Sequence, residues 1–89
     1  MIKKQLVVTN KLGLHARAAA KVVSVAARHN SSISIIHNGQ TIDAKSIMGL
    51  LILGAAKGSK LEFHLDGPDE QQALEELEAL FSDFFGEGE

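Results

Sequence analysis

Several residue types are absent or scarce: the sequence has no cysteine, tryptophan or tyrosine and a single proline. A chain without cysteine forms neither disulfides nor thiolate metal sites, and this composition is typical of proteins that work in the cytoplasm. No apolar run reaches the roughly 20 residues that a membrane-spanning helix requires. The first residues also lack the apolar block of a secretion signal. We therefore expect a cytoplasmic protein that does not insert into a membrane.

Basic residues are missing from the last third of the chain. All nine lysine and arginine residues lie within 1–60, where Asp43 is the single acid, whereas residues 61–89 hold ten acids. A basic half beside an acidic half favours an acidic protein partner or a small anion. All four phenylalanines lie in the acidic half, so the basic half has no aromatic side chain to stack on a base. This distribution argues against nucleic acid as a partner.

The rest of the composition predicts one folded domain. The chain has 89 residues, of which 45% are hydrophobic, so we expect a single domain over 1–89. Apolar residues that alternate predict strands, and apolar residues spaced near 3.6 predict helices. The predicted strands cover 2–9, 32–37, 40–43 and 61–66. The predicted helices cover 16–28, 47–53 and a last segment that Gly67-Pro68-Asp69-Glu70 opens, with Pro68 near its first position, and that runs to Phe84. Residues 85–89 are expected to form a frayed tail.

The order of these elements, β-α-β-β-α-β-α, predicts an α+β fold. Its simplest packing is an open-faced two-layer sandwich, in which three helices cover one face of a four-stranded antiparallel sheet. The dipeptide Asn38-Gly39 suits the type I′ turn of a two-residue hairpin loop. That loop would place Ile35 opposite Ile42, so both isoleucines would lie on the buried face of the sheet.

The stretch from Gly13 to Arg17 carries the first chemical signal. It joins the first predicted strand to the first predicted helix and places His15 at or just before the helix start. The first amides of a helix have no intrahelical partners and carry partial positive charge, so they attract anions. Arg17 adds planar donors that suit phosphate oxygens. An imidazole here could take a phosphoryl group on a ring nitrogen; the alternative is an ordinary solvated turn residue.

The segment between Ser46 and Gly54 carries the second signal. Ser46 suits the N-cap of a short helix and Gly54 suits its C-terminal stop. Apart from Gly49, every residue between them is apolar, which a surface helix should not be. Either this helix is wholly buried, or one side of it is an exposed apolar surface for a partner.

The other three histidines suggest no further site. His29 lies at a helix end, where a cation is favoured, and His37 and His64 lie on polar strand faces. Two imidazoles without a third ligand make a poor metal site, so we expect no metal. The sequence also has no convincing nucleophile triad, nucleotide-binding loop or paired carboxylates facing a histidine. We therefore expect no cofactor and no independent enzymatic turnover.

Two motifs resemble the signatures of one known family. The run Gly13-Leu14-His15-Ala16-Arg17-Ala18-Ala19 is similar to the active-site signature of HPr, the histidine-containing phosphocarriers of the phosphoenolpyruvate-dependent sugar phosphotransferase system. The segment from Ala44 to Leu51, followed by Ala56-Lys57-Gly58, resembles the second signature of that family. The resemblance covers essentially the whole chain.

The resemblance implies a role for each motif. His15 would accept a phosphoryl group on Nδ1 from phospho-Enzyme I and pass it to sugar-specific IIA proteins. Arg17 and the helix-start amides of Ala16 and Ala18 would hold the phosphoryl oxygens. The resemblance also implies the sheet order 1-4-2-3. The residues that would dock partners are Leu14, Ile47, Met48 and Leu51.

Ala18 departs from the family pattern, because most members have proline at this position. Proline would preset φ in the first helical turn, whereas alanine restores one N–H and leaves the turn slightly looser. This departure bears on the efficiency of transfer and not on its chemistry.

Ser46 has two interpretations. In the first, Ser46 is only an N-cap. In the second, it is also the site that a dedicated serine kinase and phosphorylase modify in some HPr proteins. Two alternatives to the sugar carrier also stand: a carrier of the related nitrogen branch, and a regulatory or ligand-binding module of the same layout that transfers nothing. The Ser46-Ile47-Met48-Gly49 segment favours the sugar branch.

Overall fold

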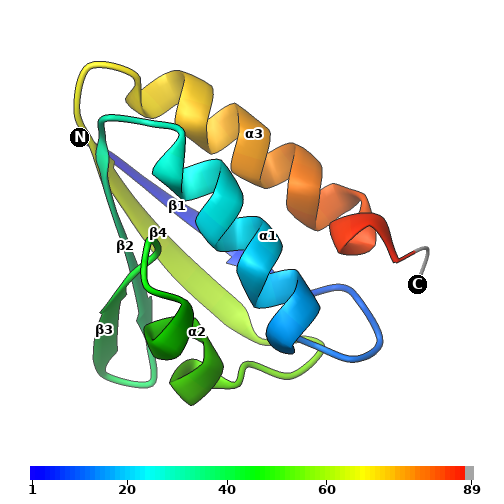
Figure 1. Ribbon diagram of the computed structural model, residues 1–89. Coiled ribbons are helices and arrows are strands. Elements are labelled where there is room, and N and C mark those ends of the chain that lie inside the picture. The colour runs from blue at the N-terminus through cyan, green and yellow to red at the C-terminus, as the bar shows by residue number, and fades with distance from the viewer. Residues whose placement is uncertain (88–89) are drawn as a thin grey trace.

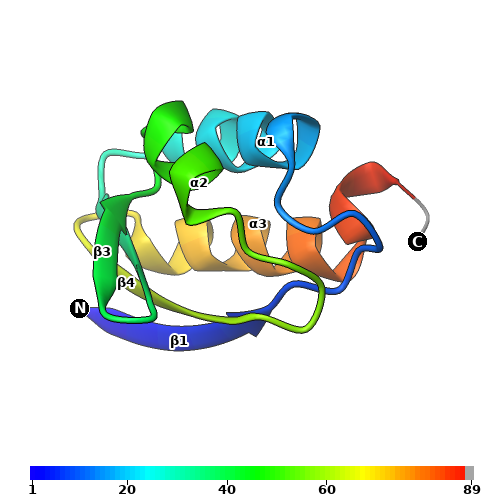
Figure 2. The same ribbon diagram turned by 90° about the horizontal axis from the view of Figure 1, so that it is seen from below.

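The computed structural model describes residues 1–87 and shows one antiparallel sheet with its helices on one face (Figures 1 and 2). The four strands are β1 (Ile2–Val7), β2 (Ser32–His37), β3 (Gln40–Asp43) and β4 (Lys60–Asp66). The helices are α1 (Ala16–Ala27), α2 (Ile47–Leu53) and α3 (Glu70–Ser82), followed by a short 3-10 turn, η1 (Phe84–Gly86). The strand order is β1-β4-β2-β3, which confirms the expected open-faced sandwich and its sheet order.

The hairpin of β2 and β3 has the predicted turn and register. Asn38 and Gly39 both have positive φ, at 50° and 78°, as a type I′ turn requires. Ile35 lies opposite Ile42. The local turn chemistry and the pattern of buried residues therefore specify the same alignment.

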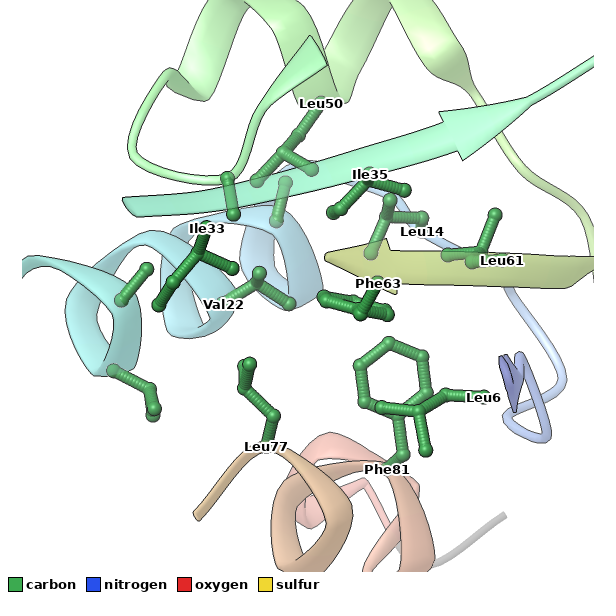
Figure 3. Close-up of a cluster of buried hydrophobic side chains, with 14 of the residues drawn as sticks. Leu6, Leu14, Val22, Ile33, Ile35, Leu50, Leu61, Phe63, Leu77 and Phe81 are labelled. Atoms are coloured by element: carbon green, nitrogen blue, oxygen red, sulfur yellow. The ribbon is translucent and has the colours of Figure 1, made fainter. Parts of the chain in front are cut away.

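The core lies between the sheet and the helices (Figure 3). Phe63 of β4 is fully buried, and its ring packs edge-on against Phe81 of α3 with centroids 5.6 Å apart. Ala18, Ala19 and Ala26 of α1 are completely buried, and their small side chains let this helix sit close to its neighbours. No helix within residues 1–87 has the length and apolar character needed to cross a membrane.

The expected frayed tail is wrong for residues 85–87. Phe85 is completely buried, and its ring centroid lies 4.8 Å from that of Phe81. The backbone reverses through left-handed conformations at Phe84 and Phe85, with φ of 51° and 54°. Burial of a phenylalanine contributes about 1.5–3 kcal/mol, which helps to offset that unfavourable backbone. The rest of the predicted tail, residues 88–89, lies outside the described residues.

Candidate functional site

The loop that enters α1 is fixed by hydrogen bonds. The side-chain amide of Asn10 donates to the carbonyl of Gly13 at 2.7 Å, and the Gly13 amide donates to the Asn10 carbonyl at 3.2 Å. Gly13 has a φ of 69°, and a Cβ there would lie 2.6 Å from the carbonyl oxygen of Ala55. The amide of Leu14 donates to that same oxygen at 2.8 Å. Glycine at position 13 therefore permits the close approach of this loop to Ala55, and that approach sets the position at which α1 begins.

His15 is the N-cap residue of α1, which confirms its predicted place at the helix start. Its backbone is extended, and its Nδ1 accepts a hydrogen bond of 3.3 Å from the amide of Arg17. The side chain is 30% exposed, so the ring is accessible from solvent. Nδ1 thus faces the amino end of α1, where the helix dipole is positive.

The amides of Ala16 and Ala18 differ in access. Neither has a hydrogen-bond partner among residues 1–87, because the first amide of α1 that donates to a backbone carbonyl is that of Ala19, to His15 at 2.8 Å. Ala16 is exposed, whereas Ala18 is completely buried. The expectation that the Ala18 amide meets a phosphoryl oxygen is therefore wrong for this conformation. The first turn packs against the core and covers that amide.

An open cavity of about 430 Å³ adjoins the His15 ring. Lys11 and Arg17 are exposed at this cavity, and neither forms a salt bridge with an acidic group among residues 1–87. Their charges favour an anion at its mouth. The residues that line the cavity are Lys11, Leu12, His15, Arg17, Gly86 and Glu87.

Glu87 contacts the other nitrogen of the His15 ring. Its Oε2 is hydrogen-bonded to Nε2 of His15, and its Oε1 accepts a hydrogen bond of 2.9 Å from the side-chain amide of Asn10. The Asn10 hydrogen bond, together with His15 and the charge of Lys21, lowers the pKa of the Glu87 carboxyl, although burial opposes that shift. The carboxylate is therefore ionised near neutral pH.

α2 has the predicted caps. The hydroxyl of Ser46 accepts a hydrogen bond of 3.1 Å from the amide of Gly49, which makes Ser46 the N-cap. Gly54 ends the helix with a φ of 55°, in the left-handed region that glycine adopts at low cost. α2 and the beginning of α1 lie at the same end of the molecule, which is the lower end in Figure 1.

α2 is an exposed apolar helix and not a wholly buried one. Leu50 is its single fully buried residue, so the exposed alternative is correct. Four large side chains form what we call the apolar patch: Ile47 (37% exposed), Met48 (63%), Leu51 (40%) and Ile52 (71%). The first three were expected to dock partners, whereas Ile52 was not, although the all-apolar pattern of α2 offered a signal for it.

Leu14 does not belong to the apolar patch. It is 3% exposed and contributes to the core cluster (Figure 3). The hydrogen bond from its amide to Ala55 draws this part of the loop inward. The expectation that Leu14 contacts a partner directly is therefore corrected: its side chain packs in the core under the loop.

His29 is buried and paired, and does not lie free at a helix end. Its side chain is 5% exposed, with Nδ1 3.0 Å from Asp69 and Nε2 3.2 Å from Glu76. Burial opposes the charged ring, but the contacts with the two carboxylates outweigh it and raise the pKa of His29. This cluster could not be predicted from the sequence, because its acids are Asp69, just before α3, and Glu76 within α3, which lie 40 or more residues away along the chain.

His37 and His64 lie on neighbouring strands, β2 and β4, but are not opposite each other. Nδ1 of His37 lies 3.2 Å from the carbonyl oxygen of Lys60, whereas His64 contacts Glu62 at 2.7 Å. His64 is opposite Ser34 in β2. Within the described part of the chain, no group of three or more acidic and histidine side chains is arranged to hold a metal ion.

Comparisons with known proteins agree on one family. A family model described as "PTS HPr component phosphorylation site" matches residues 2–83. The chain is 47% identical over 89 residues to the phosphocarrier protein HPr of Cupriavidus necator, and 44% identical to that of Neisseria meningitidis, with full coverage of both sequences in each case. It resembles the crystal structure of HPr-C-His from Thermoanaerobacter tengcongensis with a TM-score of 0.93, at 37% identity over 98% of each chain.

Proposed function

Because the chain belongs to the HPr family of phosphocarriers of the phosphotransferase system, we propose that His15 accepts a phosphoryl group from phospho-Enzyme I and donates it to sugar-specific IIA proteins. The observation that carries this proposal is the position of Nδ1, which faces the amide of Arg17 at the start of α1. The protein would act as a reaction partner in the cytoplasm, with a covalent intermediate and no turnover of its own.

The amino end of α1 supplies what a phosphoryl group on Nδ1 requires. The amides of Ala16 and Arg17 and the guanidinium of Arg17 offer donors for its oxygens. These donors are in place before the reaction, so little reorganisation accompanies the arrival of negative charge. The buried Ala18 adds no donor at the surface. The proline that the family usually carries at this position has no N–H either, so alanine here need not weaken the site.

The apolar patch on α2 supports a docking role. α2 lies at the same end of the molecule as the beginning of α1, which His15 caps, so a partner could cover both at once (Figure 1). Exposed apolar surface of this kind is typical of protein interfaces. The exposed positive residues Lys11 and Arg17, which line the cavity beside His15, suit a partner with an acidic rim. We assign Ile47, Met48, Leu51 and Ile52 to contacts with Enzyme I and IIA proteins.

Ser46 supports a regulatory role in the same proposal. Phosphate on this N-cap would lie at the positive end of α2, so the helix should remain folded. It would also place about two negative charges next to the apolar patch and repel an acidic partner. A serine kinase and phosphorylase acting on Ser46 would in this way control docking without changing the chemistry at His15.

The test is phosphorylation by radiolabelled phosphoenolpyruvate and Enzyme I. Wild-type protein should gain a phosphate that is labile to acid and stable to base, as expected of phosphohistidine, and His15→Ala should gain none. His37→Ala and His64→Ala are matched controls, because both remove another histidine that is partly exposed, and both should be labelled normally. The proposal would be overturned if the wild-type protein stayed unlabelled, or if the His15→Ala variant gained the label.

Docking is tested by charge on the apolar patch. Met48→Glu should slow transfer from Enzyme I at low protein concentration, and saturating Enzyme I should restore the rate. Transfer onward to a sugar-specific IIA protein and to its nitrogen-branch counterpart, measured with the same labelled protein, distinguishes the two branches. Faster transfer to the nitrogen-branch protein would count against the sugar assignment.

A further inference from the structure

The contact between Glu87 and Nε2 of His15 has no part in the function proposed so far. The carboxylate side chain of Glu87 is 12% exposed, and it binds Nε2 through one oxygen and Asn10 through the other. Asn10 is completely buried, and its amide also donates to Gly13 in the loop that leads into α1. Glu87 thus links the imidazole to a fixed part of the fold.

The tail that carries Glu87 is anchored at two further points. The ring of Phe85 is completely buried against Phe81, and Nζ of Lys21 in α1 donates to the carbonyl oxygen of Phe85. Both views of the ribbon show this end of the chain beside the loop that precedes α1 (Figures 1 and 2). The position of Glu87 is therefore set by contacts of this segment with α3, with α1 and with the loop that precedes α1.

The two ring nitrogens of His15 have different partners, and this difference selects one tautomer. Nδ1 accepts a hydrogen bond from the Arg17 amide, so it must carry a lone pair. Nε2 faces an ionised carboxylate, which can only accept, so Nε2 must carry the proton. The neutral ring is then protonated on Nε2 and nucleophilic on Nδ1.

We propose that Glu87 is a positioning residue for phosphoryl transfer at His15. It holds the ring with its proton on Nε2 and with its lone pair on Nδ1, on the side that faces the amino end of α1. This inference rests on the function proposed above. Carboxylates that bind the second nitrogen of a reactive or metal-bound histidine fix its tautomer and orientation in the same way.

The transfer step shows why the charge of Glu87 matters. The Nδ1 lone pair forms the N–P bond while the bond from phosphorus to the donor's leaving atom breaks, and that atom keeps the electron pair. The Nε2 proton remains on the ring, so the phosphorylated imidazole gains one positive charge. The Glu87 carboxylate lies against this developing charge and stabilises it. When the phosphoryl group moves on, the electrons return to Nδ1 and the ring is neutral again.

Glu87 does not occupy the phosphoryl site itself. Its oxygens contact Nε2 and Asn10, whereas the amides and Arg17 lie on the Nδ1 side of the ring. The positive charge of Lys21 acts on the Glu87 carboxylate and offsets part of its negative field, and Lys11 and Arg17 offset repulsion of an incoming anion. The geometry favours a residue that orients the ring over one that blocks it.

The experiment compares the full-length variants Glu87→Gln and Glu87→Ala with wild type in transfer from Enzyme I. The matched control is Asp83→Asn, which removes an exposed acid from the same tail, one with no side-chain hydrogen bond within residues 1–87. Both Glu87 variants should lower the transfer rate at saturating Enzyme I about tenfold, while the Enzyme I concentration at half-maximal rate stays unchanged. Asp83→Asn should behave as wild type.

A second measurement separates positioning from a structural role. In wild type, the ¹⁵N shifts of His15 at a pH where its ring is neutral should show a protonated Nε2 and an unprotonated Nδ1. Glu87→Ala should shift the ring toward a mixture of tautomers while melting temperature and amide spectrum stay close to wild type. Equal rates and equal ring shifts in all variants would overturn the inference. Faster transfer in Glu87→Gln would also overturn it, because it would indicate that Glu87 blocks the ring. If wild type itself takes no phosphate, the function proposed above fails instead.

Discussion

The Nδ1 of His29 lies 3.0 Å from Oδ2 of Asp69, which ties the end of α1 to the beginning of α3. The other oxygen of Asp69 accepts hydrogen bonds from the amide and the hydroxyl of Ser31, at 3.0 and 2.5 Å. Asp69 makes no hydrogen bond of its own to cap α3. Its carboxylate is therefore committed to the junction between the two helices, at the opposite end of α1 from His15.

Acid should unfold the protein partly through Asp69. Hydrogen bonds from the Ser31 hydroxyl, and to a smaller extent from the Asn30 and Ser31 amides and His29, lower the pKa of Asp69 far below its ordinary value of 3.8. Burial opposes the shift. A carboxyl with a lowered folded-state pKa stabilises the fold above the unfolded pKa and loses that contribution as the pH falls. Asp69→Asn should therefore melt at a lower temperature than wild type at pH 7, with a gap that narrows below about pH 4.

Melting curves from pH 7 to pH 2 measure this effect. Asp83→Asn makes the same chemical change at an exposed residue without a side-chain hydrogen bond in residues 1–87, so its curve should follow that of wild type. A constant gap between wild type and Asp69→Asn across the whole pH range would contradict the assignment.

His29 should act in the opposite direction. Burial disfavours its charged form, but Glu76 and Asp69 outweigh burial and raise its pKa above the ordinary value of 6.5. A histidine with a raised folded-state pKa contributes its full stability below the unfolded pKa and loses it as the pH rises through the folded value. His29→Gln should therefore cost more melting temperature at pH 6 than at pH 9.

The His29 ring can also be titrated directly by NMR, and its midpoint should lie above 6.5. His37→Gln is the control, because it replaces a more exposed imidazole that contacts a backbone carbonyl. A difference between wild type and His29→Gln that does not change with pH would show that the two carboxylates do not hold a charged ring.

Local patterns were sufficient to predict most of the fold. The hairpin turn at Asn38-Gly39 and the caps at Ser46 and Gly54 follow from chemistry within a few residues, and all three are present. His15 could also be placed at a helix start, because the strand before it and the alanine-rich helix after it are both strongly patterned. The sheet order needed the family resemblance, because nothing local says which strands lie side by side.

Contacts across long sequence separations could not be predicted. Glu87 reaches His15 because Phe85 packs into the core, and nothing local in the glycine and acidic residues that follow Phe85 indicates this contact. The pairing of His29 with Asp69 likewise depends on how α1 and α3 pack. Leu14 was misplaced for a related reason: the family resemblance implied that it docks partners, whereas its burial follows from the approach of Ala55.

Gly13 should resist substitution. Its φ of 69° is strained for other residues, and a Cβ would lie 2.6 Å from the Ala55 carbonyl oxygen and 3.0 Å from Cα of Ala56. The obstructing atoms are backbone, so one of the two loops must move. Gly13→Ala should lose about 1–3 kcal/mol of unfolding free energy and slow phosphoryl transfer, because the same loop positions His15.

Urea unfolding and transfer from Enzyme I measure the two effects of Gly13→Ala. Gly39→Ala is the control: Gly39 also has positive φ, but a Cβ there would meet nothing within 4 Å. It should lose stability through its backbone strain and retain the wild-type transfer rate at saturating Enzyme I. Equal transfer rates in the two variants would show that the approach of Gly13 to Ala55 does not set the position of His15.

A negative charge on Ser46 should weaken docking without unfolding α2. Aspartate and asparagine both replace serine well as N-caps, so Ser46→Asp and Ser46→Asn should melt near the wild-type temperature, whereas Ser46→Ala should lose about 1 kcal/mol with the hydrogen bond to Gly49. Ser46→Asp should accept phosphate from Enzyme I about tenfold more slowly than Ser46→Asn, because these two nearly isosteric residues differ in charge beside the apolar patch. The gap should shrink in high salt, which screens that charge. If the aspartate and asparagine variants accept phosphate at one rate in low salt, electrostatic control of docking through Ser46 is ruled out.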